Sequence, residues 1–173
     1  MHEVCDVLEE LVRNGTLRNY ALGGATAAGF HGEPITTRDV DVFVFVEARP
    51  GEILISLEPL LMKLRAMGFD TFEEEGLLIH NYPVRFLSCA PGLETEAVEQ
   101  AVTASWEKHS LRVMRPEHLA AIALTAGRPK DRASLVYLVE LPNFDLERFR
   151  EILRRFNLLP IWQQWSVALG LAP

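Results

Sequence analysis

Two short motifs in the first quarter of the chain carry residue types suited to chemistry on a phosphate group. The first is the glycine pair Gly23-Gly24, and the second is the aspartate pair Asp39 and Asp41. Glycines between a strand and a helix let the backbone approach a bound group and direct N–H donors towards it, and phosphate is the usual ligand. The structural alternative is an ordinary turn that requires a positive φ.

The two aspartates stand at the start of a valine and phenylalanine run that predicts a buried central strand over 40–46. Because strand side chains alternate, Asp39 and Asp41 face the same side. Two such carboxylates repel each other and lose hydration, which is costly unless a cation compensates. Mg²⁺ suits this role because it accepts one or two carboxylates and leaves its other positions to water and phosphate oxygens. Arg38 is the alternative counter-ion.

Elements with strand and helix patterns alternate in the first part of the chain, and helical patterns follow alone. We therefore expect an α+β fold, with a small mixed β-sheet packed by helices over 1–105 and a helical C-terminal part over 106–173, together in one compact unit. The patterns predict helices at 2–13, 25–30, 52–67, 94–104, 116–126, 130–139, from 145 and from 160, and strands at 20–22, 40–46, 77–79, 84–87 and 111–114.

Composition excludes several classes of protein. With 173 residues, 49% of them hydrophobic, the chain has the size and apolar content of one globular domain rather than of a disordered or repeat protein. No apolar stretch approaches the ~20 residues that a membrane span requires. Acidic residues near the N-terminus do not resemble a secretory signal, so we expect a cytoplasmic protein without a membrane partner.

Charge is divided unevenly along the chain. The net charge is −7, yet the residues after position 106 include 10 basic and 7 acidic side chains. One interpretation of this division is that an anionic ligand binds between an acidic part and a mildly basic part. The alternative is that the C-terminal helices are amphipathic and carry arginines on their exposed faces. Cys5 and Cys89 form no CxxC pair, and His80, His109 and His118 have no partner at metal-ligand spacing, so the sequence predicts no zinc site.

The spacing of the two motifs resembles a known family. Leu22-Gly23-Gly24, fourteen intervening residues and then Asp39-Val40-Asp41 look like the signature of the DNA polymerase β-like nucleotidyltransferase superfamily. With His31-Gly32, the string is similar to a small bacterial and archaeal branch that includes AbiEii/MenT-type toxins. The segment from Ala126 to Asp131 is similar to an Ala-x-Arg-x-Lys-Asp element of that branch. The resemblance extends over about 20–138.

The resemblance implies a nucleotidyltransferase-like fold and a Mg²⁺-dependent enzyme. Such an enzyme would transfer a nucleoside monophosphate from an NTP to a hydroxyl of an RNA such as a tRNA end, a protein or a small molecule. It also implies a toxin-like role with an antitoxin partner. Asp39 and Asp41 would bind the Mg²⁺ ion, and Gly23 and Gly24 would present backbone N–H groups to the β- and γ-phosphates.

Three further residues receive roles from the resemblance. Lys130 would supply positive charge to the triphosphate, and Asp131 would orient that lysine or a sugar hydroxyl. The alternative for both is a solvated helix start, where an acid is favoured by the helix dipole. Arg38 would contact phosphate or brace the aspartate pair.

The chain departs from the family pattern at two positions. Gly24 stands where many members have serine, which removes a hydroxyl contact to phosphate. Arg85 stands on the strand where many active members carry a third carboxylate, and a cation cannot ligate Mg²⁺. Three alternatives follow: one metal ion suffices, the strand is aligned differently, or the chain is an inactive nucleotide-binding or protein-interaction module of the same fold.

Overall fold

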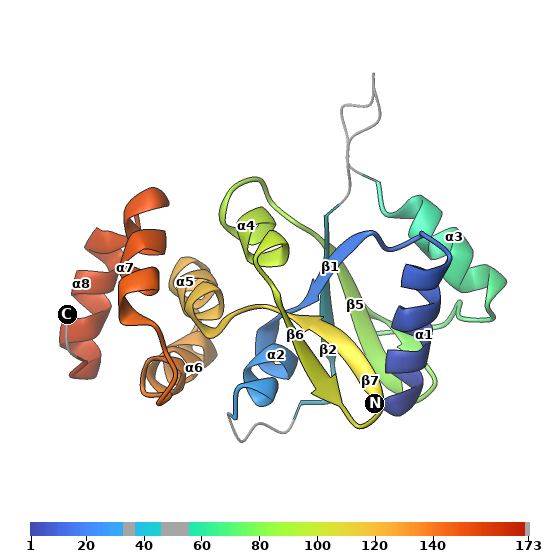
Figure 1. The fold of residues 1–173 in the computed structure, drawn as a ribbon, viewed down its shortest axis with the longest axis horizontal. Coiled ribbons are helices and arrows are strands. Elements are labelled where there is room, and N and C mark those ends of the chain that lie inside the picture. The colour runs from blue at the N-terminus through green and yellow to red at the C-terminus, as the bar shows by residue number, and fades with distance from the viewer. Residues whose placement is uncertain (33–36, 46–55, 172–173) are drawn as a thin grey trace.

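The computed structural model describes residues 1–32, 37–45 and 56–171. Within those ranges the helices are α1 (His2–Arg13), α2 (Gly24–Phe30), α3 (Glu58–Ala66), α4 (Leu93–Glu99), α5 (Pro116–Ala126), α6 (Pro129–Val139), α7 (Leu146–Arg155) and α8 (Leu159–Leu169). The strands are β1 (Asn19–Leu22), β2 (Val40–Phe45), β3 (Phe72–Glu73), β4 (Gly76–Ile79), β5 (Tyr82–Ser88), β6 (Val102–Trp106) and β7 (His109–Val113). Figure 1 shows the sheet towards one end of the molecule and helices α5 to α8 at the other.

All the described strands form one mixed sheet in the order β3-β4-β5-β2-β1-β7-β6. Strand β2 lies in the middle, antiparallel to β1 and parallel to β5, as its valine and phenylalanine run predicts. The valines Val40, Val42 and Val44 are buried, and Phe43 is buried between them in sequence. The sheet and its surrounding helices confirm the predicted fold class.

The segment after α4 differs from its prediction. The helix expected over 94–104 ends at Glu99, because Val102–Trp106 turns back and pairs antiparallel with β7. β-Branched residues such as Val102 and Thr103 favour an extended strand once a pairing partner is present. The predicted division between 105 and 106 therefore falls inside the β6–β7 hairpin, and the sheet continues to Val113.

Most of the other predicted elements are present. The glycine-rich helix ends at Phe30, and Asp145 caps α7 by accepting a hydrogen bond from the backbone N–H of Arg148. The first part of the helix expected over 52–67 lies outside the described residues, and α3 begins at Glu58.

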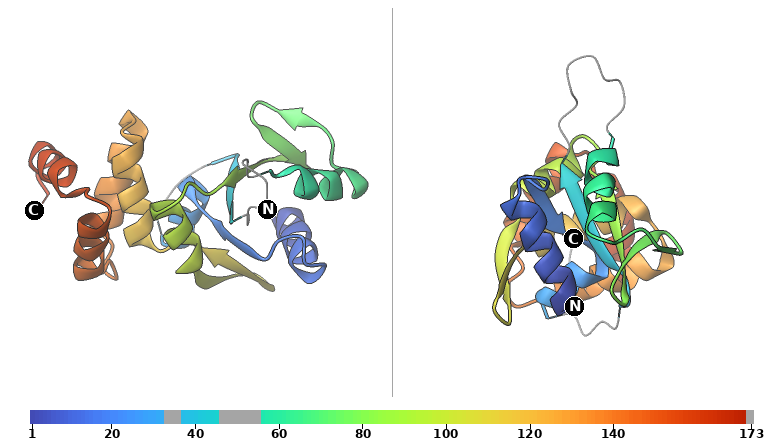
Figure 2. Two further views of the ribbon diagram at one scale, coloured as in Figure 1. Left: turned by 90° about the horizontal axis from the view of Figure 1, so that it is seen from above. Right: turned by 90° about the vertical axis from the view of Figure 1, so that its right-hand side faces the viewer.

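Aromatic residues form much of the contact between the C-terminal helices. The Phe149 ring on α7 meets the Trp162 ring on α8 edge to face at 5.1 Å, and Phe144 at 5.2 Å. Trp162 and Trp165 are buried, while the guanidinium of Arg132 lies over the Trp165 ring. Within the described part of the chain, no helix is long and apolar enough to cross a membrane. Figure 2 shows these helices at the opposite end of the molecule from the far edge of the sheet.

A buried polar network joins α4, α5 and α7. His118 is fully buried, and its Nε2 lies 3.0 Å from Glu96 Oε1, which also accepts a hydrogen bond from Arg155 Nη2. Burial lowers the pKa of His118, although the neighbouring carboxylate acts in the opposite direction. Burial raises the pKa of Glu96, but hydrogen bonds from Arg155 and His118 outweigh that effect and leave it lowered.

We predict that His118 makes folding less stable as the pH falls below its unfolded pKa of about 6.5. Because its folded pKa is lowered, the unfolded chain binds a proton in this window that the folded chain does not. When the pH is lowered from neutral to below 6.5, the unfolding free energy of His118→Gln, measured with urea, should therefore fall less than that of the wild type. His80→Gln, at an exposed histidine, is the control. An unchanged pH slope in His118→Gln would contradict the prediction.

Candidate functional site

The turn between β1 and α2 packs directly against the aspartate strand. The backbone N–H of Gly23 donates to the carbonyl oxygen of Asp41 at 2.9 Å. A Cβ atom on Gly24 would lie 2.2 Å from Asp41 Oδ2, and one on Gly23 would lie 2.5 Å from the Phe43 ring. Gly24 also has a φ of +54°, which disfavours side chains. Close approach to the strand therefore requires both glycines.

This geometry bears on the expected phosphate contacts. The N–H group of Gly23 is already engaged by Asp41, so it is not a free donor for a phosphate oxygen. Gly24 begins α2, where backbone N–H groups lack intrahelical partners. The glycine pair therefore positions Asp41, and phosphate binding by the pair stays a prediction.

Asp39 is held by hydroxyl groups from two sides. Its carbonyl oxygen accepts hydrogen bonds from Thr26 Oγ1 on α2, at 3.0 Å, and from Thr37 Oγ1, at 3.2 Å. Its side chain is 47% exposed, whereas the Asp41 side chain is only 15% exposed. Asp39 is thus the more accessible of the two carboxylates.

One guanidinium bridges the two carboxylates. Strand β5 runs parallel to β2 in a register that places Arg85 opposite Asp41. Arg85 Nε donates to Asp41 Oδ1 at 2.7 Å, and Arg85 Nη2 lies 2.7 Å from Asp41 Oδ1 and 3.2 Å from Asp39 Oδ2. The two aspartates therefore converge on one point, as predicted for neighbours on one face, and a cation occupies that point.

The carboxylates and Arg85 have opposite implications for metal binding. Two converging carboxylates are a donor set that fits a single Mg²⁺ ion. Arg85 competes for the same oxygens, and its register opposite Asp41 places a cation where the family resemblance implies a third carboxylate. The residues present therefore fit one metal ion and do not fit a second one beside Arg85.

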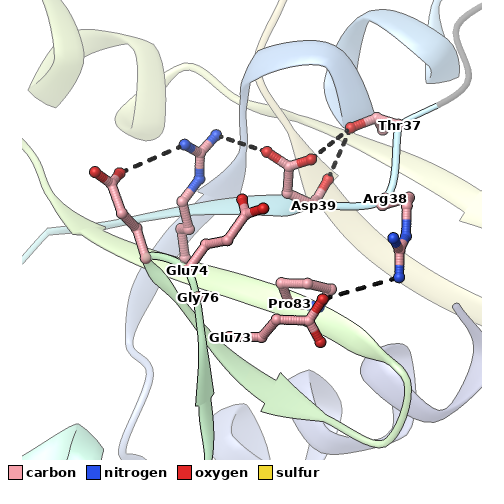
Figure 3. Close-up of a pocket in the computed structure, with 9 residues that line it drawn as sticks. Thr37, Arg38, Asp39, Glu73, Glu74, Gly76 and Pro83 are labelled. Atoms are coloured by element: carbon pink, nitrogen blue, oxygen red, sulfur yellow. Dashed lines mark hydrogen bonds and ion pairs between the residues drawn. The ribbon is translucent and has the colours of Figure 1, made fainter.

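A hollow of about 440 Å³ opens next to this cluster (Figure 3). It combines four acidic side chains with two arginines. Its other side is formed by the acidic run Glu73-Glu74-Glu75, and Arg85 Nη1 lies 3.9 Å from Glu75 Oε2. The run therefore lines the hollow although it is exposed to solvent. The lining residues are Thr37, Arg38, Asp39, Glu73, Glu74, Glu75, Gly76, Pro83 and Arg85.

Arg38 lies at the rim of the hollow rather than between the aspartates. Its side chain is 81% exposed, and its Nη2 lies 3.9 Å from Glu73 Oε1, as Figure 3 shows. Arg85, on another strand, takes the bracing role that was one of the two expected for Arg38. Contact of Arg38 with phosphate stays a prediction.

The segment from Ala126 to Asp131 joins the end of α5 to the start of α6. Asp131 accepts hydrogen bonds from the backbone N–H of Arg128 at 3.0 Å and from Arg128 Nε at 2.8 Å, so its carboxylate caps the start of the helix. Asp131 is 9% exposed, so it is not a solvated acid. Lys130 lies between these residues in the first turn of the helix. The capping geometry gives Asp131 a structural role whether or not it also orients Lys130.

Sequence reasoning missed the supporting residues of the site. Thr26 and Thr37 are common polar residues whose contacts with Asp39 depend on how α2 lies beside β2. Arg85 was expected only as a cation that cannot ligate Mg²⁺. Its ion pairs with the two aspartates were missed because they depend on the β2–β5 register. The one available clue in the sequence was that two neighbouring aspartates need a counter-ion and that Arg85 lies on a predicted strand.

Solved structures provide the comparison with known proteins. The crystal structure of an antigenic nucleotidyltransferase-like protein from Paracoccidioides brasiliensis matches with a TM-score of 0.59 and 17% sequence identity, covering 96% of this chain and 90% of that one. The solution structure of the antibiotic-resistance factor ANT(2'')-Ia matches with a TM-score of 0.45 and 13% identity, covering 98% and 91%. No protein-family model and no curated protein matches the chain. The first likeness confirms a nucleotidyltransferase-like fold.

We predict that Gly24→Ala lowers the unfolding free energy by more than the ~1–2 kcal/mol that a left-handed residue alone costs. The added methyl group would also collide with Asp41 Oδ2. Gly15→Ala is the control for φ alone, since Gly15 has a φ of +76° and open space around it. Gly29→Ala, in the helix and with open space, should stabilise by about 0.5–1 kcal/mol. Equal effects for Gly24→Ala and Gly15→Ala in urea unfolding would contradict the close packing.

We also predict that Arg85→Gln lowers the unfolding free energy by about 1–3 kcal/mol, because it removes the guanidinium that bridges two neighbouring carboxylates. The same substitution in an Asp41→Asn background should cost less, with a coupling energy of about 0.5–3 kcal/mol. The control is Arg65→Gln, whose ion pair with Glu58 joins two exposed side chains and should change stability by less than about 1 kcal/mol. The bridging role is refuted if Arg85→Gln behaves like that control.

Proposed function

We propose that the chain is a Mg²⁺-dependent nucleotidyltransferase that moves a nucleoside monophosphate from an NTP to a hydroxyl group of an acceptor. The observation that carries this proposal is the convergence of Asp39 and Asp41 on a single cationic position next to the glycine turn. The nucleotidyltransferase-like fold supports it. The large hollow beside the two carboxylates offers space for a ligand.

Asp39 and Asp41 are the proposed metal ligands. When bound, Mg²⁺ would neutralise phosphate oxygens and stabilise the negative charge that develops on the leaving pyrophosphate. Asp39 is exposed enough to receive an ion from solvent, while Asp41 is fixed in position by the turn. Arg85 competes with the ion for the same oxygens, so nucleotide and metal must together displace one of its contacts.

Charge around the hollow limits how a nucleotide would enter it. The three glutamates at 73–75 repel a triphosphate, so the phosphates would lie on the side of Arg38 and Arg85. A guanidinium released from a carboxylate is a good bidentate donor to phosphate oxygens. We therefore propose that Arg85 neutralises the aspartates before binding and contacts phosphate afterwards.

The acceptor is proposed only as a class: an RNA such as a tRNA end, a protein or a small molecule. RNA contacts would concentrate on Arg128, Lys130, Arg132 and the arginines of α7. Much of the α7 charge is partnered, since Arg148 pairs with Asp145 and Arg155 pairs with Glu96. A toxin role with an antitoxin partner is a further proposal that rests on the family resemblance alone.

A second candidate function follows from Arg85. A cation already bound between the two aspartates would leave a nucleotide-binding or protein-interaction module of the same fold without turnover. The two candidates differ in whether Mg²⁺ can compete with the guanidinium.

Each NTP is titrated into the protein in a calorimeter in the presence of Mg²⁺, and we predict that at least one NTP binds. The substitutions Asp39→Asn and Asp41→Asn should abolish this binding. Removal of either carboxylate takes away a metal ligand, whereas Asp70→Asn changes the charge at an exposed site away from the hollow and should bind like the wild type. Incubation with an α-labelled NTP and cellular extract should then label an acceptor.

The possible results distinguish the two candidate functions. Label transfer that both aspartate substitutions abolish supports the transferase. Binding without transfer to any acceptor supports the inactive module. No binding of any NTP, or binding that Asp39→Asn and Asp41→Asn leave intact, would refute the proposed site.

A further inference from the structure

A second cluster of potential metal ligands lies at the opposite edge of the sheet from the hollow, where the first turns of α1 meet the β6–β7 hairpin (Figure 1). His2 and Asp6 come from one face of α1, and His109 is the first residue of β7. One ligand atom from each lies within 4.8 Å of the others. This group was not predicted from the sequence, because His109 is 107 positions from His2.

The other members of the cluster lie close to the two ring nitrogens of His2. His2 Nδ1 lies 3.1 Å from His109 Nε2 and 3.1 Å from Glu107 Oε2. Asp6 approaches both histidines, with Oδ2 at 3.7 Å from His2 Nε2 and Oδ1 at 3.9 Å from His109 Nε2. Two imidazole nitrogens and nearby carboxylate oxygens are the donor types that Zn²⁺ prefers.

His109 is the buried member of the cluster. Its side chain is 1% exposed, and its Nδ1 makes no well-aligned hydrogen bond. A buried imidazole that faces a second imidazole needs a proton or a cation between the two nitrogens. Among the described residues, no lysine or arginine lies within 4.0 Å of the carboxylates of Asp6, Glu9 and Glu107. Within ion-pair distance, the two histidines are therefore the partners of these carboxylates among the described residues.

Glu9 occupies the position of an outer-sphere partner. Its Oε1 lies 3.1 Å from His109 Nδ1, on the far side of the ring from His2, and accepts a hydrogen bond from the backbone N–H of Ser110 at 3.3 Å. Metal-bound histidines commonly direct their second nitrogen at such a carboxylate, which fixes the ring and raises its basicity.

We propose that His2, Asp6 and His109, with Glu107 beside them, bind one divalent transition-metal ion of the Zn²⁺ class. The ion would fasten α1 to the β6–β7 hairpin, and binding would stabilise the folded chain because the unfolded chain does not bring these residues together. The site shares no residue with the hollow at Asp39, so it does not depend on the proposed transferase activity.

The test uses the full chain without a histidine tag, freed of metal with a chelator and titrated with Zn²⁺ in a calorimeter. One equivalent should bind with release of protons, and the ion should raise the temperature of thermal unfolding. His2→Gln and His109→Gln should abolish both effects. Glu9→Gln should weaken binding about 10- to 100-fold, as removal of an outer-sphere carboxylate does. His80→Gln, at an exposed histidine that is not a member of the cluster, is the matched control.

His2 decides the test if His109→Gln fails to fold, because the His2 side chain is 42% exposed and can be replaced without disturbing the core. The proposal is overturned if less than one equivalent of Zn²⁺ binds, if His2→Gln binds as the wild type does, or if Mg²⁺ binds the cluster equally well. Replacement with Co²⁺ should give the visible absorption of a four-coordinate site in the wild type, and not in His2→Gln.

Discussion

The bridge from Arg85 to Asp39 and Asp41 is the interaction on which the candidate site depends. Two carboxylates at the start of a buried central strand would repel each other and lose hydration without a cation. The parallel register of β2 and β5 places Arg85 opposite Asp41, so the sheet itself supplies that cation. The guanidinium also makes the two carboxylates converge, and convergence is what a single metal ion would need. The same contact thus stabilises the fold and defines the position where chemistry is proposed.

The elements around this contact restrict it from several sides. The turn at Gly23-Gly24 packs so closely on β2 that it leaves no space for a Cβ atom beside Asp41. Thr26 and Thr37 fix the backbone at Asp39. The hollow opens on the exposed side, where Asp39 is accessible to solvent. A site with one carboxylate fixed and one accessible is organised to receive a ligand without rearrangement of the sheet.

Local patterns in the sequence predicted the elements, and contacts between distant residues explain where prediction failed. The run over 40–46 identified the central strand because valine and phenylalanine favour buried strands, although position 46 lies outside the described residues. The alternation of this run correctly placed both aspartates on one face. The helix expected over 94–104 was too long because Val102 continues a helical period but pairs with β7 instead. Neither the Arg85 contacts nor the grouping of His2 with His109 could be predicted, since each depends on a register or packing between distant segments.

The central claim is that Mg²⁺ with a nucleotide and the Arg85 guanidinium compete for the carboxylates of Asp39 and Asp41. A crystal structure with Mg²⁺ and a non-hydrolysable NTP analogue tests it most directly, because it locates the ion, the phosphates and the arginine together. We expect an ion bound by both aspartates, with Arg85 turned from at least one of them towards a phosphate oxygen. An analogue bound without an ion, or Arg85 still bridging both carboxylates as it does here, would contradict it.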